Sequence, residues 1–203
     1  MSTTTARAGR VQKEYRRQEL IQAAFRRIAE RGFEGLRTRD VAAEAGVNIA
    51  TLHYYFPTKE ALIRGVIGQA MARFRTTLTP HGSPGDQLVT HLRAVQQLMR
   101  REPQVAAVMG ELALRSSRDR SLARIMGEVN QGWHRTLRGL LHRAASEKAI
   151  PATRDSDEAA ALIQTTLMSM ALPSISTARS EQALRELERW LQFREPSRSR
   201  SSK

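Results

Sequence analysis

Apolar residues recur along most of this chain at intervals of three and four positions, which is the spacing of an amphipathic helix. The clearest stripes predict helices over residues 20–28, 88–99, 122–141, 159–170 and 184–191. No segment shows the alternation at every second position that a half-buried strand has. The pattern therefore predicts an all-α fold.

Proline, glycine and charge divide this helical pattern into parts. Residues 79–86, TPHGSPGD, concentrate Pro and Gly, so we predict a loop and a domain boundary there. The residues PSRSRSSK over 196–203 are polar and charged, which favours a disordered tail. The expected parts are a flexible basic arm over 1–12, one helical domain over 13–78, a second over 79–195, and the tail.

The chain is strongly basic, with a formal net charge of +13. The first 78 residues hold 14 Lys+Arg against 7 Asp+Glu, and the rest hold 19 against 13. Such a surface attracts polyanions, either nucleic acid or acidic lipid. No apolar stretch reaches the roughly 18 residues of a membrane span, and the start, MSTTTARAGR, lacks the apolar centre of a signal peptide. We therefore expect a cytoplasmic protein without a membrane partner.

The composition gives little support to catalytic chemistry. The chain has no cysteine, which removes disulfides, thiolate nucleophiles and thiolate metal ligands. Its five histidines fall in no recognised metal-ligand spacing, and no glycine-rich phosphate loop is present. We expect no catalytic residue, no metal site and no cofactor, and the chain is not predicted to be an enzyme.

The segment TRDVAAEAGVNIATLHYY, residues 38–55, is predicted to form two short helices that cross at a tight turn. Gly46 follows the first helix, where a left-handed residue costs least as glycine. Asn48 can cap the second helix with its side-chain oxygen. Ala42 lies where a larger side chain would hold the helices apart. This set is typical of a helix-turn-helix, with an ordinary helical hairpin as the alternative.

The residues from Leu20 to Leu62 resemble the DNA-binding domain of the TetR family of bacterial transcription regulators. The run AAFRRIAERGFEGLRTRDVAAEAGVNIATLHYYFPTKEAL carries the resemblance. It implies an N-terminal three-helix helix-turn-helix DNA-binding domain over 13–78, followed by an α-helical ligand-binding and dimerisation domain over 79–195. His53 departs from the tyrosine usual in the family, and Ile49 with Ala50 is less polar than the common Ser-Lys pair.

By this resemblance, residues 48–55 form the recognition helix, whose exposed face enters the major groove of DNA. Residues 49–51 would face base edges, and the polar tips at 53–55 would meet phosphates, while Phe56 belongs to the core. The lysine that opens the next helix would share a phosphate with the free N–H groups of that helix. The candidate DNA contacts are Thr38, Arg39, Asn48, Ile49, Ala50, Thr51, His53, Tyr54, Tyr55 and Lys59.

Basic residues also precede the first predicted helix, and they leave two interpretations open. An arm with these side chains can lie along the DNA backbone or minor groove, or it can be merely solvated. The residues are Arg7, Arg10, Lys13, Arg16 and Arg17.

The second half of the chain has enough helices to enclose an apolar cavity for a small-molecule effector. Adaptable or flat apolar residues and a few polar groups on its stripes could hold such a molecule, although each is more often a core residue. The candidates are His91, Met99, Met109, Met126, Trp133, His134, Gln164 and Met168. The last two stripes resemble the helix pair through which the family forms homodimers, but they can also pack inside one chain.

The sequence thus predicts a homodimeric, ligand-responsive transcription regulator, most simply a repressor. It would bind a palindromic double-stranded DNA operator and leave it when a small apolar or amphipathic effector enters the second domain. A ligand-independent or activating DNA-binding protein is the alternative. An architectural DNA-binding protein would have little need of the long helical second half.

Overall fold

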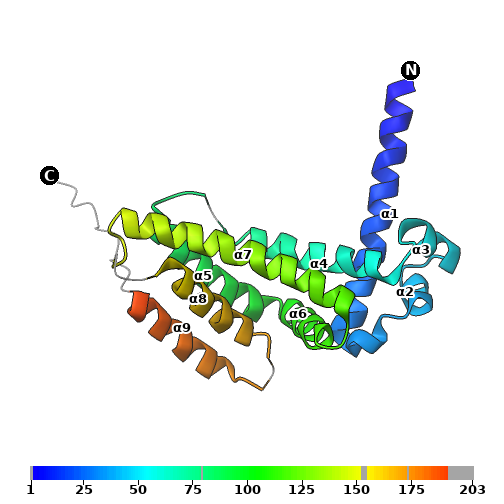
Figure 1. Cartoon of the computed structure of the whole chain (residues 1–203). Helices are drawn as coiled ribbons and strands as arrows, with labels where there is room; N and C mark the ends of the chain where they lie inside the picture. The colour runs from blue at the N-terminus through cyan, green and yellow to red at the C-terminus, as the bar shows by residue number, and fades with distance from the viewer. Residues whose placement is uncertain (1, 79, 152–154, 173, 192–203) are drawn as a thin grey trace. The chain divides into compact units, whose positions relative to one another are not determined.

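The computed structural model describes residues 2–78, 80–151, 155–172 and 174–191, and within this part of the chain it contains helices and no strand. The all-α prediction is confirmed. Figure 1 shows the elements in chain order. They are α1 (Ser2–Arg31), the 3-10 turn η1 (Phe33–Gly35), α2 (Thr38–Glu44), α3 (Ile49–Tyr55), α4 (Lys59–Arg75), α5 (Pro84–Arg101), α6 (Pro103–Ser116), α7 (Arg120–Ser146), α8 (Ser156–Ser169) and α9 (Thr177–Leu191).

The chain forms two compact units, and the division differs from the boundary expected at residues 79–86. The first unit holds residues 1–72 and 107–126, and the second holds 73–106 and 127–203. Helices α4, α6 and α7 therefore contribute residues to both units. The physical reason is that α6 and the start of α7 pack with the first helices of the chain, which no feature of the 79–86 loop could indicate.

The first unit is built on the apolar faces of its helices. Five side chains from three helices are no more than 1% exposed: Phe25 and Ile28 of α1, Leu52 of α3, and Leu62 and Val66 of α4. Helix α1 ends where Gly32 adopts a positive φ of 66°, and the Gly32 N–H donates to the Ile28 carbonyl oxygen at 2.9 Å. The apolar pattern after residue 20 thus fixes which face of α1 is buried.

Helix α1 begins at Ser2, so the flexible arm expected over residues 1–12 is corrected for the residues that the structure describes. The expectation rested on the absence of an apolar stripe before Leu20. Helix formation needs no such stripe, because alanine, arginine, glutamine and lysine all favour the helix. Gly9 has the poorest helix propensity of this stretch, followed by the threonines and Val11, and no proline interrupts it.

The second unit encloses a separate apolar core drawn from α5, α7, α8 and α9. Helix α5 starts with a capping box, in which the Ser83 Oγ accepts from the Asp86 N–H and the Asp86 carboxylate accepts from the Ser83 N–H. Leu167 of α8 is fully buried and Leu187 of α9 is 4% exposed. Leu167 and Leu187 of these stripes therefore pack inside the chain, whereas Leu162 of the first stripe is 42% exposed.

The structure bears differently on the expected disordered tail and on the expected absence of a membrane span. The tail over 196–203 lies outside them. Within the described helices, none is long and apolar enough to cross a membrane.

Candidate nucleic-acid interface

The turn between α2 and α3 has the geometry that the sequence predicts. Gly46 has a φ of 65°, and the Val47 N–H donates to the Ala42 carbonyl oxygen at 2.9 Å. A Cβ built on Gly46 would meet nothing within 4 Å. Glycine is therefore favoured here by its backbone conformation and not by lack of space. Ala42 is 2% exposed, as expected for the point where the two helices cross.

Asn48 caps α3 as predicted. Its Oδ1 accepts from the Thr51 N–H at 2.7 Å and from the Thr51 hydroxyl at 2.9 Å. The only hydroxyl proton of Thr51 is thus used inside the protein, while the Thr51 oxygen keeps lone pairs that can accept a further bond. The cap fixes the first turn of α3 and the orientation of both side chains.

Helix α3 presents one face to solvent and buries the other. Leu52 is fully buried and Phe56, just after the helix, is 2% exposed, which confirms its assignment to the core. On the other face Ile49 is 42% exposed and Tyr54 is 66% exposed, and Ala50 and His53 are exposed as well. An exposed isoleucine and an exposed tyrosine on so short a helix form a surface that the described residues leave uncovered.

The rings at the end of α3 are ordered by their neighbours. Tyr55 is half-buried and meets Tyr54 edge to face, with ring centroids 5.1 Å apart. Lys13 of α1 places its Nζ 5.0 Å from the centroid of the Tyr54 ring. Tyr54 is therefore held from two sides while most of its surface stays accessible.

The starts of α2 and α4 come together around a shallow groove. It has a volume of about 510 Å³ and is lined by Leu36, Arg37, Thr38, Arg39, Asp40 and Lys59. Three of the predicted contact residues thus share one solvent-accessible concavity. Helix α4 is capped at the same place, where the Thr58 Oγ1 accepts from the Ala61 N–H at 3.1 Å.

Lys59 is more constrained than its sequence position indicates. Its Nζ lies 4.5 Å from the centroid of the Phe33 ring, and the Arg115 guanidinium lies 5.0 Å from the same ring. Partial burial lowers the pKa of Lys59; nearby Arg115 adds to this, while Glu34 and Asp119 oppose it. The ammonium group is packed on the Phe33 ring at the edge of the groove.

Residues of α6 and α7, which come much later in the chain, contact the turn before α2 and the first turn of α4. The Glu111 Oε2 accepts from the Phe33 N–H at 3.0 Å, and Arg124 pairs with Glu60 at 3.1 Å. The pKa of Glu60 is lowered, first by the nearby Ser121 side chain and then by hydrogen bonds from Arg64. Sequence reasoning missed these contacts because nothing local links residues that lie 64 to 78 positions apart.

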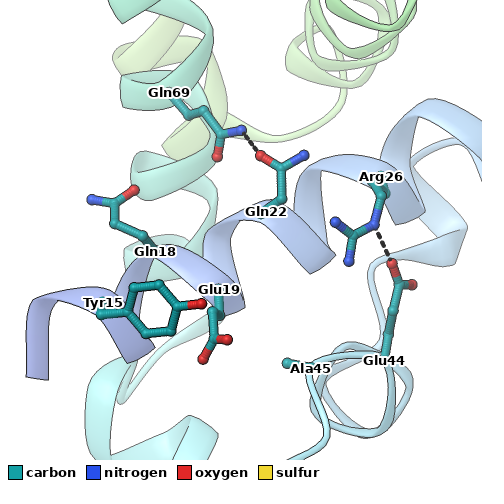
Figure 2. A pocket seen from close by; sticks show the side chains of 8 residues that line it. All are labelled: Tyr15, Gln18, Glu19, Gln22, Arg26, Glu44, Ala45 and Gln69. Atoms are coloured by element: carbon teal, nitrogen blue, oxygen red, sulfur yellow. Dashed lines mark hydrogen bonds and ion pairs between the residues drawn. The ribbon is translucent and has the colours of Figure 1, made fainter. Parts of the chain in front are cut away.

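A second groove of the first unit is polar and internally paired. Figure 2 shows it between α1, the end of α2 and α4, with a volume of about 460 Å³. Arg26 bonds Glu44 at 2.8 Å, Gln69 donates to Gln22, and Glu19 pairs with Arg16. Because its charges already have partners, this groove shows no preference for a particular ligand.

The candidate effector residues are divided between the two units. Met109 and Met126 belong to the first unit, and the others belong to the second. Met99, Met109, Trp133, His134 and Met168 are half-buried, whereas Met126 is buried. The Gln164 Nε2 donates to the Asn130 carbonyl oxygen at 2.9 Å, and the His134 Nε2 lies 3.0 Å from the Asp157 Oδ1.

His91 is the most deeply buried of these candidates, and both of its ring nitrogens are bonded. The Trp133 Nε1–H donates to the His91 Nε2 at 3.0 Å. The Thr77 hydroxyl donates to the Phe74 carbonyl oxygen, so it must accept from the His91 Nδ1–H, 2.8 Å away. Burial lowers the pKa of His91 to about 4, against a smaller opposing effect of a backbone hydrogen bond at Thr77. His91 is a neutral, fully bonded core histidine in this structure.

Among the described residues, no group of three or more acidic, histidine or cysteine side chains is arranged to hold a metal ion. The arrangement in the first unit is of another kind. It consists of a short exposed helix set by a glycine turn, with a lysine and an arginine at the starts of the flanking helices.

Known proteins share this arrangement. A sequence model described as bacterial regulatory proteins of the tetR family matches residues 20–66. The HTH-type transcriptional regulator PksA of Bacillus subtilis is 40% identical over 53 residues, which are 26% of each chain. The HTH-type transcriptional repressor KstR2 of Mycobacterium tuberculosis is 34% identical over 77 residues, 36% of this chain and 38% of that protein. The match thus spans only about a quarter to two fifths of the length of these relatives.

The likeness of the fold extends further than that of the sequence. The crystal structure of a TetR transcription regulator from Haloarcula marismortui superposes with a TM-score of 0.77, covering 88% of this chain and 97% of that one. At 17% identity this likeness concerns the fold alone. The glycine turn, the capped α3 and the helices around them define a helix-turn-helix protein. Over residues 20–66 the chain is similar to the TetR family of bacterial regulatory proteins.

Proposed function

We propose that this chain is a ligand-responsive transcription regulator that acts as a repressor. It binds a palindromic DNA operator as a dimer and leaves it when a small apolar or amphipathic molecule binds. The observation that carries this proposal is the exposed face of α3, where Ile49 and Tyr54 remain uncovered beside the cations at the starts of α2 and α4.

The α3 face suits the major groove of DNA. Ile49, Ala50 and the methyl of Thr51 can contact thymine methyl groups, and the Thr51 oxygen can accept from a base amino group. The polar tips of His53, Tyr54 and Tyr55 can bond phosphates. Phosphate contacts set the register of the protein on the duplex, and base contacts specify the sequence.

The cations at the helix starts suit the backbone on either side of that groove. Arg39 is exposed, and Lys59 and Thr38 line the same concavity. Thr58 caps α4 and leaves N–H groups of its first turn for an anion. In this proposal Lys59 keeps its place on the Phe33 ring while its ammonium meets a phosphate.

We assign the homodimer to the exposed faces of α8 and α9. Leu162 of α8 is 42% exposed, next to exposed Ala161 and near exposed Thr165, while Ile163 and Leu167 face the core. A leucine with small neighbours is a suitable centre for a twofold contact, because the same patch meets itself.

The link from effector to DNA runs through α6 and α7, which contribute residues to both units. Glu111 of α6 bonds the turn before α2, and Arg124 of α7 pairs with the first turn of α4. A molecule that binds better when α6 or α7 has shifted would therefore move the helix starts that carry Thr38 and Lys59. Such coupling is typically worth about 1 to 3 kcal/mol.

Selection of duplexes from a random-sequence pool tests the function directly. We expect the wild-type protein to enrich a palindromic site, and the variant Ile49→Ala/His53→Ala to fold but lose that enrichment. Failure of the wild type to retain any duplex would overturn the proposal. With the selected site in hand, a thermal-shift screen finds ligands, and release of the duplex by a stabilising ligand separates an effector-responsive repressor from a ligand-independent DNA-binding protein.

A further inference from the structure

The first turns of α1 extend beyond the core of the first unit. The helix has 30 residues and a length of about 45 Å at 1.5 Å per residue. From Arg7 to Glu19 every residue is exposed or half-buried, and Leu20 is the first buried residue after them. Figure 1 shows the N-terminal part of α1, in dark blue, extending beyond α3. Packing against the core therefore does not explain the N-terminal half of the helix.

Two contacts fix the direction in which one side of this extension faces. The Lys13 Nζ lies 5.0 Å from the ring centroid of Tyr54, on the exposed face of α3. Four residues further along, the Arg17 guanidinium lies 5.2 Å from the Phe56 ring centroid, just after α3. The side of α1 that carries these two cations is thus turned toward the C-terminal end of α3.

The helical repeat places Arg10 on that side and Arg7 at its edge. Arg10 is seven residues before Arg17, two turns of helix, and so points in nearly the same direction. Arg7 precedes Arg10 by three residues, which turns its side chain about 60° further around the helix, to the flank of the basic side. The opposite side carries Val11 and Tyr15, which are 63% and 60% exposed, and leads to the polar groove of Figure 2.

The basic side is not neutralised. The first acidic residue of the sequence is Glu14, which lies 3.8 Å from Arg17, and Arg16 pairs with Glu19 at 2.8 Å. Within the part of the chain that the structure describes, Arg7, Arg10 and Lys13 pair with no carboxylate. A row of unpaired cations on a helix favours a polyanion as its partner.

We propose that residues 7–17 of α1 form a helical, rigid phosphate-binding element that continues the DNA-contact surface of α3 along the duplex backbone. This inference rests on the proposed function, since Tyr54 and Lys13 are placed at the edge of the same surface. Arg7, Arg10 and Lys13 follow one another at about 4.5 Å along the axis of α1. Each strand of DNA carries one phosphate per ~3.4 Å along the duplex axis. The long side chains of Arg7 and Arg10 can therefore reach different phosphates.

Charge removal tests the contact. A labelled duplex of random sequence is titrated at several salt concentrations with the wild type, with Arg7→Gln/Arg10→Gln, and with Arg101→Gln/Arg143→Gln, which removes the same charge from exposed residues of α5 and α7. We expect the α1 variant to bind at least about tenfold more weakly near 0.1 M salt, with the slope of log affinity against log salt lower by about two per chain. The control variant, Arg101→Gln/Arg143→Gln, should bind as the wild type does.

If the α1 variant and the control variant lose the same affinity for the duplex, the loss comes from the change in net charge alone, and the proposal is overturned. Wild-type affinity and slope in the α1 variant would overturn it as well, and would leave the proposed function intact if the wild type binds the duplex. Absence of duplex binding by the wild type itself would instead reject the proposed function.

Rigidity is tested at Gly9 without any change of charge. A Cβ at Gly9 meets nothing within 4 Å, so Gly9→Ala is sterically free and raises helix propensity, whereas Gly9→Pro interrupts the helix. We expect Gly9→Ala to bind random duplex as tightly as the wild type or more tightly, and Gly9→Pro to be weakened by several-fold. Circular dichroism confirms the change in helix content. Full binding by a Gly9→Pro protein that has lost helix would show a flexible arm and overturn the rigid element.

Discussion

The two compact units use their polar and aromatic side chains in opposite ways. In the first unit Tyr54 is 66% exposed and the groove beside Lys59 opens to solvent. In the second unit His91 is 1% exposed, and the Trp133 indole and the Thr77 hydroxyl bond its two nitrogens. The side chains of the first surface are exposed without any rearrangement. The hydrogen bonds of His91 in the second unit would have to break before its ring nitrogens could bond a ligand.

This difference makes the free-energy cost of breaking internal hydrogen bonds smaller for DNA binding at α3 than for ligand binding at His91. DNA can meet the α3 face without loss of an internal hydrogen bond, because the cap between Asn48 and Thr51 leaves acceptor lone pairs free. A ligand that used His91 would have to replace bonds whose loss leaves buried polar atoms unpaired, at about 1 to 3 kcal/mol each. An effector is therefore expected to contact half-buried residues such as Met99 and Met168 before it disturbs His91.

The largest expected effect separates the buried and exposed faces of α8. Leu167 is fully buried and Leu162 is 42% exposed. We expect Leu167→Arg to lower the free energy of unfolding by more than about 4 kcal/mol, because it buries an unpaired charge in the core of the second unit. Leu162→Arg should keep its helix content but become a monomer. Circular dichroism melts and light scattering measure the two outcomes.

Either result of this pair can contradict the structural assignment. A Leu162→Arg protein that remains a dimer places the interface away from the exposed face of α8. A Leu167→Arg protein as stable as the wild type is incompatible with the burial of that side chain.

The next effect concerns the buried network of the second unit. Folding lowers the pKa of His91 from its ordinary value of 6.5 to about 4, so the unfolded chain binds more protons between these values. The stabilisation is complete above about pH 6.5 and is lost as the pH falls toward 4, a change of about 3 kcal/mol. Denaturant unfolding at several pH values should show this loss in the wild type, while His91→Gln should lack that part of the slope. Parallel curves for the two proteins would mean that carboxylates alone set the acid sensitivity.

The helix-turn-helix was predictable because its determinants are local. Gly46 needs its positive φ wherever the turn occurs, and Asn48 caps a helix that starts one residue later. These choices fix the exposed face of α3 through the helical repeat alone. The same reasoning correctly placed Phe56 in the core.

The rest could not be predicted for reasons that are also physical. An apolar stripe shows which face of a helix is buried but not what buries it, and so Leu167 and Leu187 gave no sign that their partners lie in the same chain. The bond between Glu111 and the Phe33 N–H joins residues 78 positions apart, and that between Trp133 and His91 joins residues 42 apart. The helical start of α1 was missed because the prediction relied on an apolar stripe, which an exposed helix does not have.

A smaller effect tests whether α3 reads bases. Ile49 is 42% exposed, so Ile49→Ala should change the free energy of unfolding by no more than about 0.5 kcal/mol. If its methyl groups meet thymine, affinity for the selected operator should fall by about 1 to 2 kcal/mol, with affinity for random duplex unchanged. Competition titrations on both duplexes measure the difference, and Ile49→Val serves as a control that keeps part of the contact. Equal losses on both duplexes would assign Ile49 to the backbone or to packing.

The smallest effect separates packing from phosphate binding at Lys59. Its ammonium lies on the Phe33 ring, so loss of the side chain can lower stability even if no phosphate is involved. Lys59→Gln removes the charge, and Lys59→Arg keeps a cation that can stack on the same ring. If Lys59 meets a phosphate, Lys59→Gln should lower the salt slope by about one per chain on operator and random duplex alike, and Lys59→Arg should restore it. Salt titrations and thermal melts of both variants decide the matter, because a lower melting temperature with an unchanged salt slope would make Lys59 a packing residue of the first unit.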